Sequence, residues 1–187
     1  MTVEDRARLV AAVLHFALIE QGSEANRLFR NLYVFDVLHF RETGRTATNL
    51  EYLAGEFGPY PAALARELSE RLRPDLAERV SVAHLGSNEG RDVVHPLTEQ
   101  APLADLFSPQ ELAVLAQVDG LIAASGDLAD IVTTLDNGAW VRALKNDRHT
   151  PIAMEETVAP EAPNRAAILQ QSAEYKGRRA RIRALAA

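Results

Sequence analysis

The amino-acid sequence predicts a mainly helical α+β fold: a compact domain with one small β-hairpin, followed by a C-terminal helix. Apolar residues recur at helical spacing over several long segments, while two short runs between residues 79 and 97 alternate as strands do. With 187 residues, 47% of them apolar, the chain is long enough to bury one core. We divide it into a domain over 1–150, a linker or surface loop over 151–163 and a basic C-terminal helix or tail over 164–187.

The first two helices are expected over residues 3–20 and 24–43. Thr2 is a capping residue for the first helix, with Asp5 three residues later, and apolar residues follow on a broad face. The second helix carries leucine, valine and phenylalanine on its inner face, and Gly44 is its stop signal.

After these helices the pattern predicts a turn, a third helix and a hairpin. Gly58-Pro59-Tyr60-Pro61 reads as a rigid turn that begins a helix reaching about Leu72, because proline fixes its own backbone and restricts the residue before it. Pro74 is expected to end that helix. The alternating segments 79–85 and 91–97, with a Gly-containing stretch between them, predict the hairpin.

The second half begins with the strongest start signal in the chain. Ser108 is a capping serine, Pro109 occupies the first helical position and Glu111 the third, so a helix is expected over 109–124. A short helix should then run to about Leu135. Asn137-Gly138 is interpreted as a break before Trp140, around which we expect the core to close.

Composition excludes several classes of function. The chain has no cysteine, so disulfides, thiolate metal sites and cysteine nucleophiles are ruled out. Its five histidines show no metal-binding spacing, and glycine-rich nucleotide loops and the hydrolase serine motif are missing. No uncharged run of about 18 residues occurs, and the charged start does not read as a signal peptide. We expect a cytoplasmic protein that needs no cofactor or metal and contacts no membrane.

Charge is distributed unevenly. The chain carries −6 overall, but residues 173–187 carry +4, which leaves −10 on the rest. An acidic body repels phosphate backbones and argues against nucleic acid as a partner. The basic tail is the exception, and a DNA-binding regulator acting through it is the third-ranked interpretation.

Asp36 and His39 lie three residues apart on the second helix, so their side chains can meet. A carboxylate beside an imidazole could orient a general base, and with Tyr33 and Tyr52 the pair could form a polar pocket in an enzyme or a small-molecule-binding protein. No nucleophile is placed beside them by the sequence. We therefore favour a structural pair that holds the helix against the region of Arg45 or Tyr52, and we expect no catalytic residue.

The order of residues from Leu28 to Pro61 resembles a known family. Leu-Tyr-x-x-Asp-x-x-His is followed by Gly, then Tyr, then Gly-Pro-x-Pro, an order similar to the Panacea domain of SocA-like antitoxins. The chain departs from the usual pattern at Tyr60, Asp136 and Ala139. The residues that match the motif, and to which the resemblance gives a structural role, are Tyr33, Asp36, His39, Gly44, Gly58, Pro59, Pro61 and Trp140.

The resemblance implies an antitoxin rather than an enzyme. Such a protein would neutralise a cognate toxin, similar to SocB, by direct binding and would deliver it as an adaptor to the ClpXP protease. We assign toxin binding to Tyr52, Phe57 and Tyr60, since an exposed aromatic on a rigid turn is a good interface anchor. The chain ends like the bacterial rescue tag read by Clp-family unfoldases, so protease contact is assigned to Arg179, Arg183, Leu185, Ala186 and Ala187.

Overall fold

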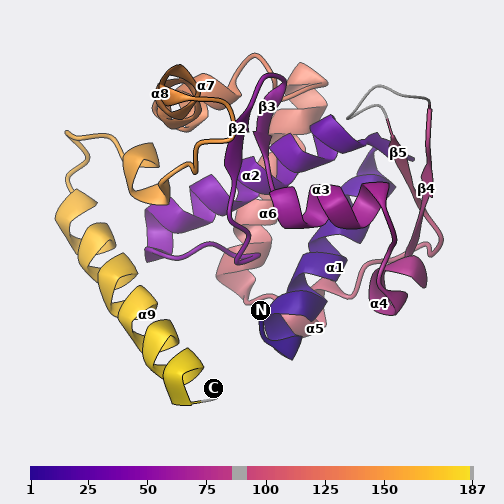
Figure 1. Ribbon diagram of the computed structural model, residues 1–187, viewed down its shortest axis with the longest axis horizontal. Coiled ribbons are helices and arrows are strands. Elements are labelled where there is room, and N and C mark those ends of the chain that lie inside the picture. The colour runs from indigo at the N-terminus through magenta and orange to yellow at the C-terminus, as the bar shows by residue number, and fades with distance from the viewer. Residues whose placement is uncertain (86–91, 186–187) are drawn as a thin grey trace.

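Three long helices form the centre of the molecule (Figure 1). The structure is a computed structural model that describes residues 1–85 and 92–185. Helix α1 spans Val3–Ile19, α2 spans Ala25–Thr43 and α6 spans Pro109–Ser125. Helices dominate over two small antiparallel sheets, so the predicted mainly α, α+β class is confirmed.

Helix α2 is buried on nearly every side. Every residue from Leu28 to Phe40 is buried, including the polar ones. This burial follows from the packing, because α1, α6, the second small sheet and the C-terminal helix all contact α2. A helix enclosed in this way must pair its polar side chains internally, and that requirement determines the polar network described below.

Gly44 ends α2 as expected, and it has a second role. Its φ of 69° places it in the left-handed region that favours glycine, and its N–H bonds Phe40 O at 2.8 Å. A Cβ at this position would lie 2.6 Å from Ile168 O and 2.8 Å from Ser172 N, both in the C-terminal helix. Glycine is thus required here for the turn and for the close approach of another helix.

The predicted hairpin is present and has gained a third strand. Strands β4 (Val80–Ala83) and β5 (Val93–Pro96) pair antiparallel, while residues 86–91 between them lie outside the described part of the chain. The two-residue strand β1, Ser23–Glu24, pairs with the other edge of β5, giving the order β1-β5-β4. The short link between α1 and α2 therefore supplies the third strand of this sheet.

The Gly-Pro-x-Pro segment is a strand and not the predicted turn. Strand β3, Gly58–Tyr60, pairs antiparallel with β2, Leu53–Gly55, and Pro59 stands opposite Ala54. Proline is tolerated here because β3 has no further strand on its outer edge in this two-stranded sheet. The two residues left between the strands, Glu56 and Phe57, form the tip of the hairpin.

The shorter helices differ from the predictions at several ends. The third helix stops at Ser69 rather than Leu72, and Pro74 begins a short helix instead of only ending one. The capping box predicted at Ser108 and Glu111 is present. The remaining bounds are α3 Ala62–Ser69, α4 Pro74–Ala77, α5 Leu103–Leu106, α7 Val132–Leu135 and α8 Ala139–Asn146.

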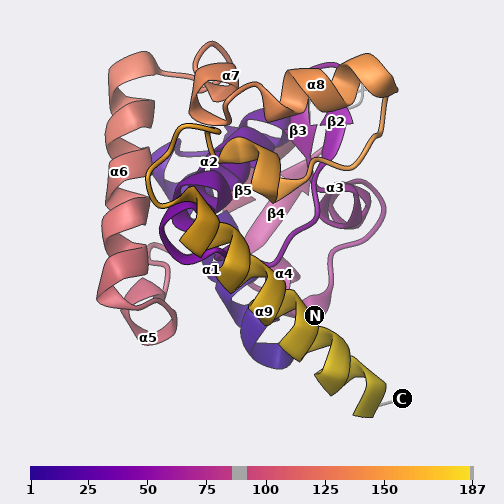
Figure 2. The same cartoon turned by 90° about the vertical axis from the view of Figure 1, so that its left-hand side faces the viewer.

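The C-terminal part is fastened to the body more firmly than a linker would be. A 3₁₀ turn, Met154–Thr157, lies within the predicted loop, and Arg41 of α2 donates to Thr157 O at 3.0 and 2.6 Å. Helix α9, Arg165–Leu185, then packs beside α2, and its last turns extend past the body in both views (Figures 1 and 2). No helix in the described ranges has the length and apolar character needed to cross a membrane.

Candidate interaction surface

Asp36 is at the centre of a sealed polar cluster. Its Oδ1 accepts from the Thr48 N–H at 2.9 Å, and its Oδ2 accepts from the Tyr52 hydroxyl at 2.9 Å and from the Thr48 hydroxyl. Burial raises the pKa of Asp36 to about 6, against the hydrogen bonds from Thr48 and Tyr52, which lower it. Asp36 thus ties α2 to the chain segment that returns from Gly44.

A second cluster connects α2 to α8. The Tyr33 hydroxyl donates to Asp136 Oδ2 at 3.0 Å, and the backbone N–H of Trp140 donates to the same oxygen at 2.8 Å. Burial raises the pKa of both Tyr33 and Asp136. Asp136 therefore accepts a backbone N–H from the first turn of α8, which no residue of that helix can pair.

His39 turns away from Asp36 to other partners. Its Nδ1–H donates to Arg45 O at 2.8 Å, and its Nε2 lies 3.3 Å from Glu111 Oε1 without hydrogen-bond geometry. Burial lowers the pKa of His39. Burial also opposes ionisation of Glu111, but an ion pair with Arg8 and hydrogen bonds from Ser108 hold the pKa of Glu111 below its ordinary value.

These side chains are closed to ligands. Tyr33 and Asp36 have no exposed surface, and His39 and Tyr52 are each 1% exposed. The alternative of an open polar pocket built on Asp36, His39 and Tyr52 is therefore wrong in geometry. Tyr52 cannot contact a toxin as predicted, because its ring packs on Tyr33 in the core and its hydroxyl donates to Asp36.

Phe57, in contrast, projects from the tip of the β2–β3 hairpin with 67% of its surface exposed. Arg30 of α2 holds its backbone, donating from Nη1 to Phe57 O at 3.0 Å. The same guanidinium makes a bidentate pair with Asp127, at 3.0 and 2.7 Å. A buried arginine with both ends engaged fixes where this exposed aromatic ring stands.

The rest of the hairpin is clamped as well. The Trp140 indole N–H donates to Gly55 O at 3.0 Å. The edge of β2 that faces away from β3 bonds to residues 149–152. Ala54 N donates to Thr150 O and Ile152 N donates to Tyr52 O, each at 2.9 Å. Tyr60 packs partly against the core and meets the His149 side chain, so Phe57 is the fully presented aromatic of this hairpin.

Two glycines allow this arrangement. Gly58 has a φ of 130°, and a Cβ there would lie 3.3 Å from Arg30 Cγ. A Cβ at Gly55 would lie 2.9 Å from Gly58 O and from a Tyr60 ring carbon. The lack of a side chain at Gly58 therefore lets the hairpin come into contact with Arg30, which supports its tip.

Part of the basic tail is already engaged. Arg179 donates to Asp5 Oδ2 at 3.0 Å and also to Asn49 and Tyr175, and Lys176 pairs with Glu155 at 2.5 Å. The structure describes the helical backbone of Arg183 and Leu185 but not their side chains, and Ala186 and Ala187 lie outside the described residues. Of the predicted protease contacts, Arg179 thus serves to hold α9 to the start of α1.

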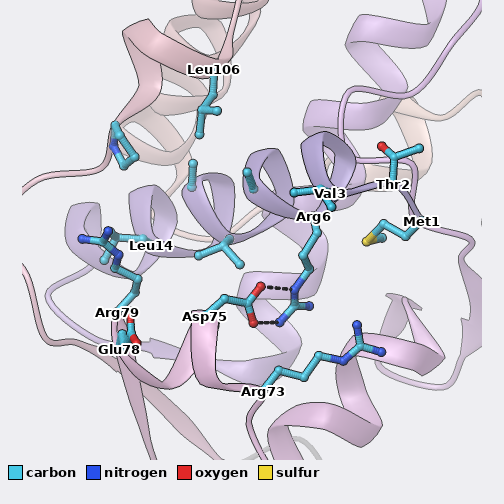
Figure 3. A pocket seen from close by; sticks show the side chains of 14 residues that line it. Met1, Thr2, Val3, Arg6, Leu14, Arg73, Asp75, Glu78, Arg79 and Leu106 are labelled. Carbon is cyan, nitrogen blue, oxygen red and sulfur yellow. Dashed lines mark hydrogen bonds and ion pairs between the residues drawn. The ribbon is translucent and has the colours of Figure 1, made fainter.

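A separate groove of about 540 Å³ runs along α1 (Figure 3). Its floor is apolar and includes Val10 and Leu14, and Arg6 is tied to Asp75 at its side. Figure 1 places α4 and α5, which border this groove, at the end of the molecule opposite the β2–β3 tip. Acidic and basic side chains both line it, so its charge favours neither a cation nor an anion.

Comparison of the chain with family models, curated proteins and solved structures found no significant match. Among the described residues, no group of three or more histidine, aspartate and glutamate side chains is arranged to hold a metal ion. Sequence reasoning missed Arg30 and Asp127. They are 97 positions apart, and Arg30 stands next to Asn31 and one turn after Arg27, so nothing near it in the sequence marked it as a buried residue.

Proposed function

We propose that this protein is an antitoxin that neutralises a cognate toxin by direct binding, with Phe57 as the central anchor. The exposure of Phe57 on a rigid hairpin is the observation that carries this proposal. Aromatic side chains contribute a large share of binding energy at interfaces, and a support fixed in advance lowers the entropy lost on binding.

The residues that resemble the Panacea pattern support this surface from beneath. Asp36 and His39 attach α2 to the segments that follow it, and Gly58 and Pro59 form the strand behind the tip. A motif of buried residues that positions one exposed aromatic is what a binding module requires. Specificity would then come from the side chains around the tip, which the motif leaves unspecified.

The adaptor part of the proposal assigns α9 to ClpXP and the hairpin tip to a toxin similar to SocB. The last turns of α9 extend past the body (Figure 2), and Ile182 in this part of the helix is 63% exposed. An apolar residue among exposed Arg178 and Arg181 gives this end both apolar surface and positive charge. The hairpin tip and the end of α9 belong to different elements, so a partner bound to one surface would leave the other surface accessible. The proposed setting is the cytoplasm.

The test of toxin binding is co-expression with the product of the neighbouring gene, followed by affinity measurement. Phe57→Ala should weaken the complex at least tenfold, in line with about 1.4 kcal/mol or more for a central aromatic. Leu97→Ala, which removes an apolar side chain that is 57% exposed directly after β5, outside the β2–β3 hairpin, is the matched control. Equal affinity of wild type and Phe57→Ala would remove the tip from the interface.

The test of the adaptor role is degradation of the captured toxin by purified ClpXP. Addition of the full chain should speed toxin loss, and changing Leu185, Ala186 and Ala187 to aspartate should slow it without altering toxin affinity. If the toxin were degraded at the same rate with and without this protein, the adaptor role would fail while toxin binding could stand.

A further inference from the structure

A second depression lies where α1 and α6 end and α2 begins. Its volume is about 520 Å³, within the range of ligand pockets. Three carboxylates line it, those of Glu20, Glu24 and Asp119, and its apolar surface includes Ile19, Val93 and Ile122. We refer to these six residues as the acidic pocket.

The charges around the acidic pocket do not balance. Arg27 is the cation that lines it, and this side chain is already occupied, with Nε 2.7 Å from Glu20 Oε1 and Nη2 donating to Gly126 O. Asp119 meets the His15 side chain at 3.0 Å. No side chain in the described ranges pairs with Glu24, so the described lining of the pocket carries a net negative charge.

The helix ends add to this charge. Helices α1 and α6 both end here, and neither has a basic side chain in its last turn. Each C-terminal end carries roughly half a negative charge. Helix α2 starts at the same place and contributes roughly half a positive charge, so two negative ends meet one positive end.

Glu20 strengthens the preference for a cation. Its side chain is only 6% exposed, and its Oε1 is shared by Arg27 and the Asn31 amide, which donates at 3.3 Å. Its Oε2 and the Asn31 Oδ1 are buried acceptors with no hydrogen-bond donor in the described part of the chain. A carboxylate beside the pocket is therefore only partly compensated, and a nearby cation would stabilise it.

The apolar surface of the acidic pocket favours a cation that is carried on an aliphatic side chain. Ile19 at its rim is 40% exposed and offers apolar surface close to the carboxylates. Arginine and lysine side chains combine methylene groups with a charged end, and they cover apolar surface while the charge finds its partner.

Two arginines of α2 connect the acidic pocket to the proposed anchor. Arg27 and Arg30 lie one turn apart on α2 and bind successive residues, Gly126 and Asp127, while Arg30 also holds Phe57 O. One partner of ordinary interface size could cover both places. We infer that the acidic pocket receives an arginine or lysine side chain of the toxin that contacts Phe57, an inference that rests on the proposed function.

The first experiment needs no toxin. Butylguanidinium, titrated into the full chain and followed by NMR, should give saturable shifts at the amides of Gly22, Ala123 and Gly126. The double variant Glu24→Gln/Asp119→Asn should bind it at least fivefold more weakly, and the control Glu51→Gln/Glu70→Gln should bind it as wild type does. Lack of saturable shifts, or equal binding of neutral butylurea, would overturn the inference.

The second experiment separates this inference from the proposed function. With toxin captured, Glu24→Gln/Asp119→Asn should weaken the complex at least fivefold and reduce its dependence on salt. If Phe57→Ala weakens the complex and the double variant does not, the function stands and the acidic pocket is excluded from the interface. If butylguanidinium binds but the neighbouring gene product does not, the pocket stands as a cation site and the antitoxin function fails.

Discussion

Among single residues, Asp36 shows most clearly what the enclosure of α2 requires. A carboxylate without solvent contact is costly, and here the Thr48 N–H, the Thr48 hydroxyl and the Tyr52 hydroxyl offset that cost. The hydrogen bonds do not offset it fully, because burial still raises the pKa of Asp36 to about 6.

This residue should leave a mark on the pH dependence of folding. The folded chain holds the Asp36 proton more tightly than the unfolded chain, so its contribution to stability falls as pH rises from about 4 to about 6. We expect a loss of about 3 kcal/mol across that window, which Asp36→Asn should abolish. Urea unfolding of both proteins from pH 4 to 7.5 measures the difference, and parallel profiles would contradict it.

Taking the difference between the two proteins is necessary because other carboxyls act in the opposite sense. The pKa values of Asp75, Glu111 and Asp127 are held below their ordinary values, so these groups add stability as pH rises through the more acidic range. Their contribution is common to wild type and Asp36→Asn and cancels in the comparison.

At the scale of elements, α9 offers a test that uses an interior glycine. A Cβ added at Gly177 would meet no atom within 4 Å, and alanine is favoured over glycine inside helices by about 0.5–1 kcal/mol. Gly177→Ala should therefore raise hydrogen-exchange protection of α9 amides roughly two- to fivefold. Unchanged protection would mean that these amides exchange without unfolding of the helix.

Helix ends with local signals were predictable, while those that depend on distant contacts were not. Ser108 and Glu111 satisfy each other within one turn, so the beginning of α6 could be predicted from four residues. The break predicted at Asn137-Gly138 is present, because α7 ends at Leu135 and α8 begins at Ala139. The long-range part is that Asp136 accepts from the N–H of Trp140 and also from the Tyr33 hydroxyl. A glycine alone does not indicate which side of it is helical.

The candidate site was predictable only in part, for the same reason. Phe57 was assigned as an aromatic residue beside the Gly-Pro-x-Pro segment, and its exposure on a two-residue hairpin loop fits that role. Tyr52 was misassigned, because nothing near it in the sequence shows that its hydroxyl returns to Asp36. The Arg30–Asp127 pair arises from the packing of α2 against the end of α6 and has no local signature.

At the scale of the whole molecule, the C-terminal helix is attached through its own small apolar cluster. Phe40, Val158 and Ile168 pack together apart from the main core, and Tyr175 and Arg179 add polar contacts to Asn49. Residues 151–163 thus connect two packed parts and contribute to the second, rather than serving as a free spacer.

Removal of α9 should consequently weaken the fold without abolishing it. A chain that ends at Pro163 keeps the main core but uncovers Phe40, and loss of the buried Ile168 alone should lower the free energy of unfolding by about 2 kcal/mol. Denaturant unfolding should remain a single transition at a lower midpoint. A midpoint equal to that of the full chain would show that α9 contributes no stability.

Gly44 gives experimental control over this attachment. Because a methyl group at that position would press on the backbone of α9 at Ile168 and Ser172, Gly44→Ala would act as a wedge between the two helices while leaving every residue of α9 unchanged. The end of α2 and the packing of α9 against it therefore depend on the same position, which must remain without a side chain. Gly44→Ala, a substitution 124 residues before Ile168, would therefore weaken the packing of α9 against the body.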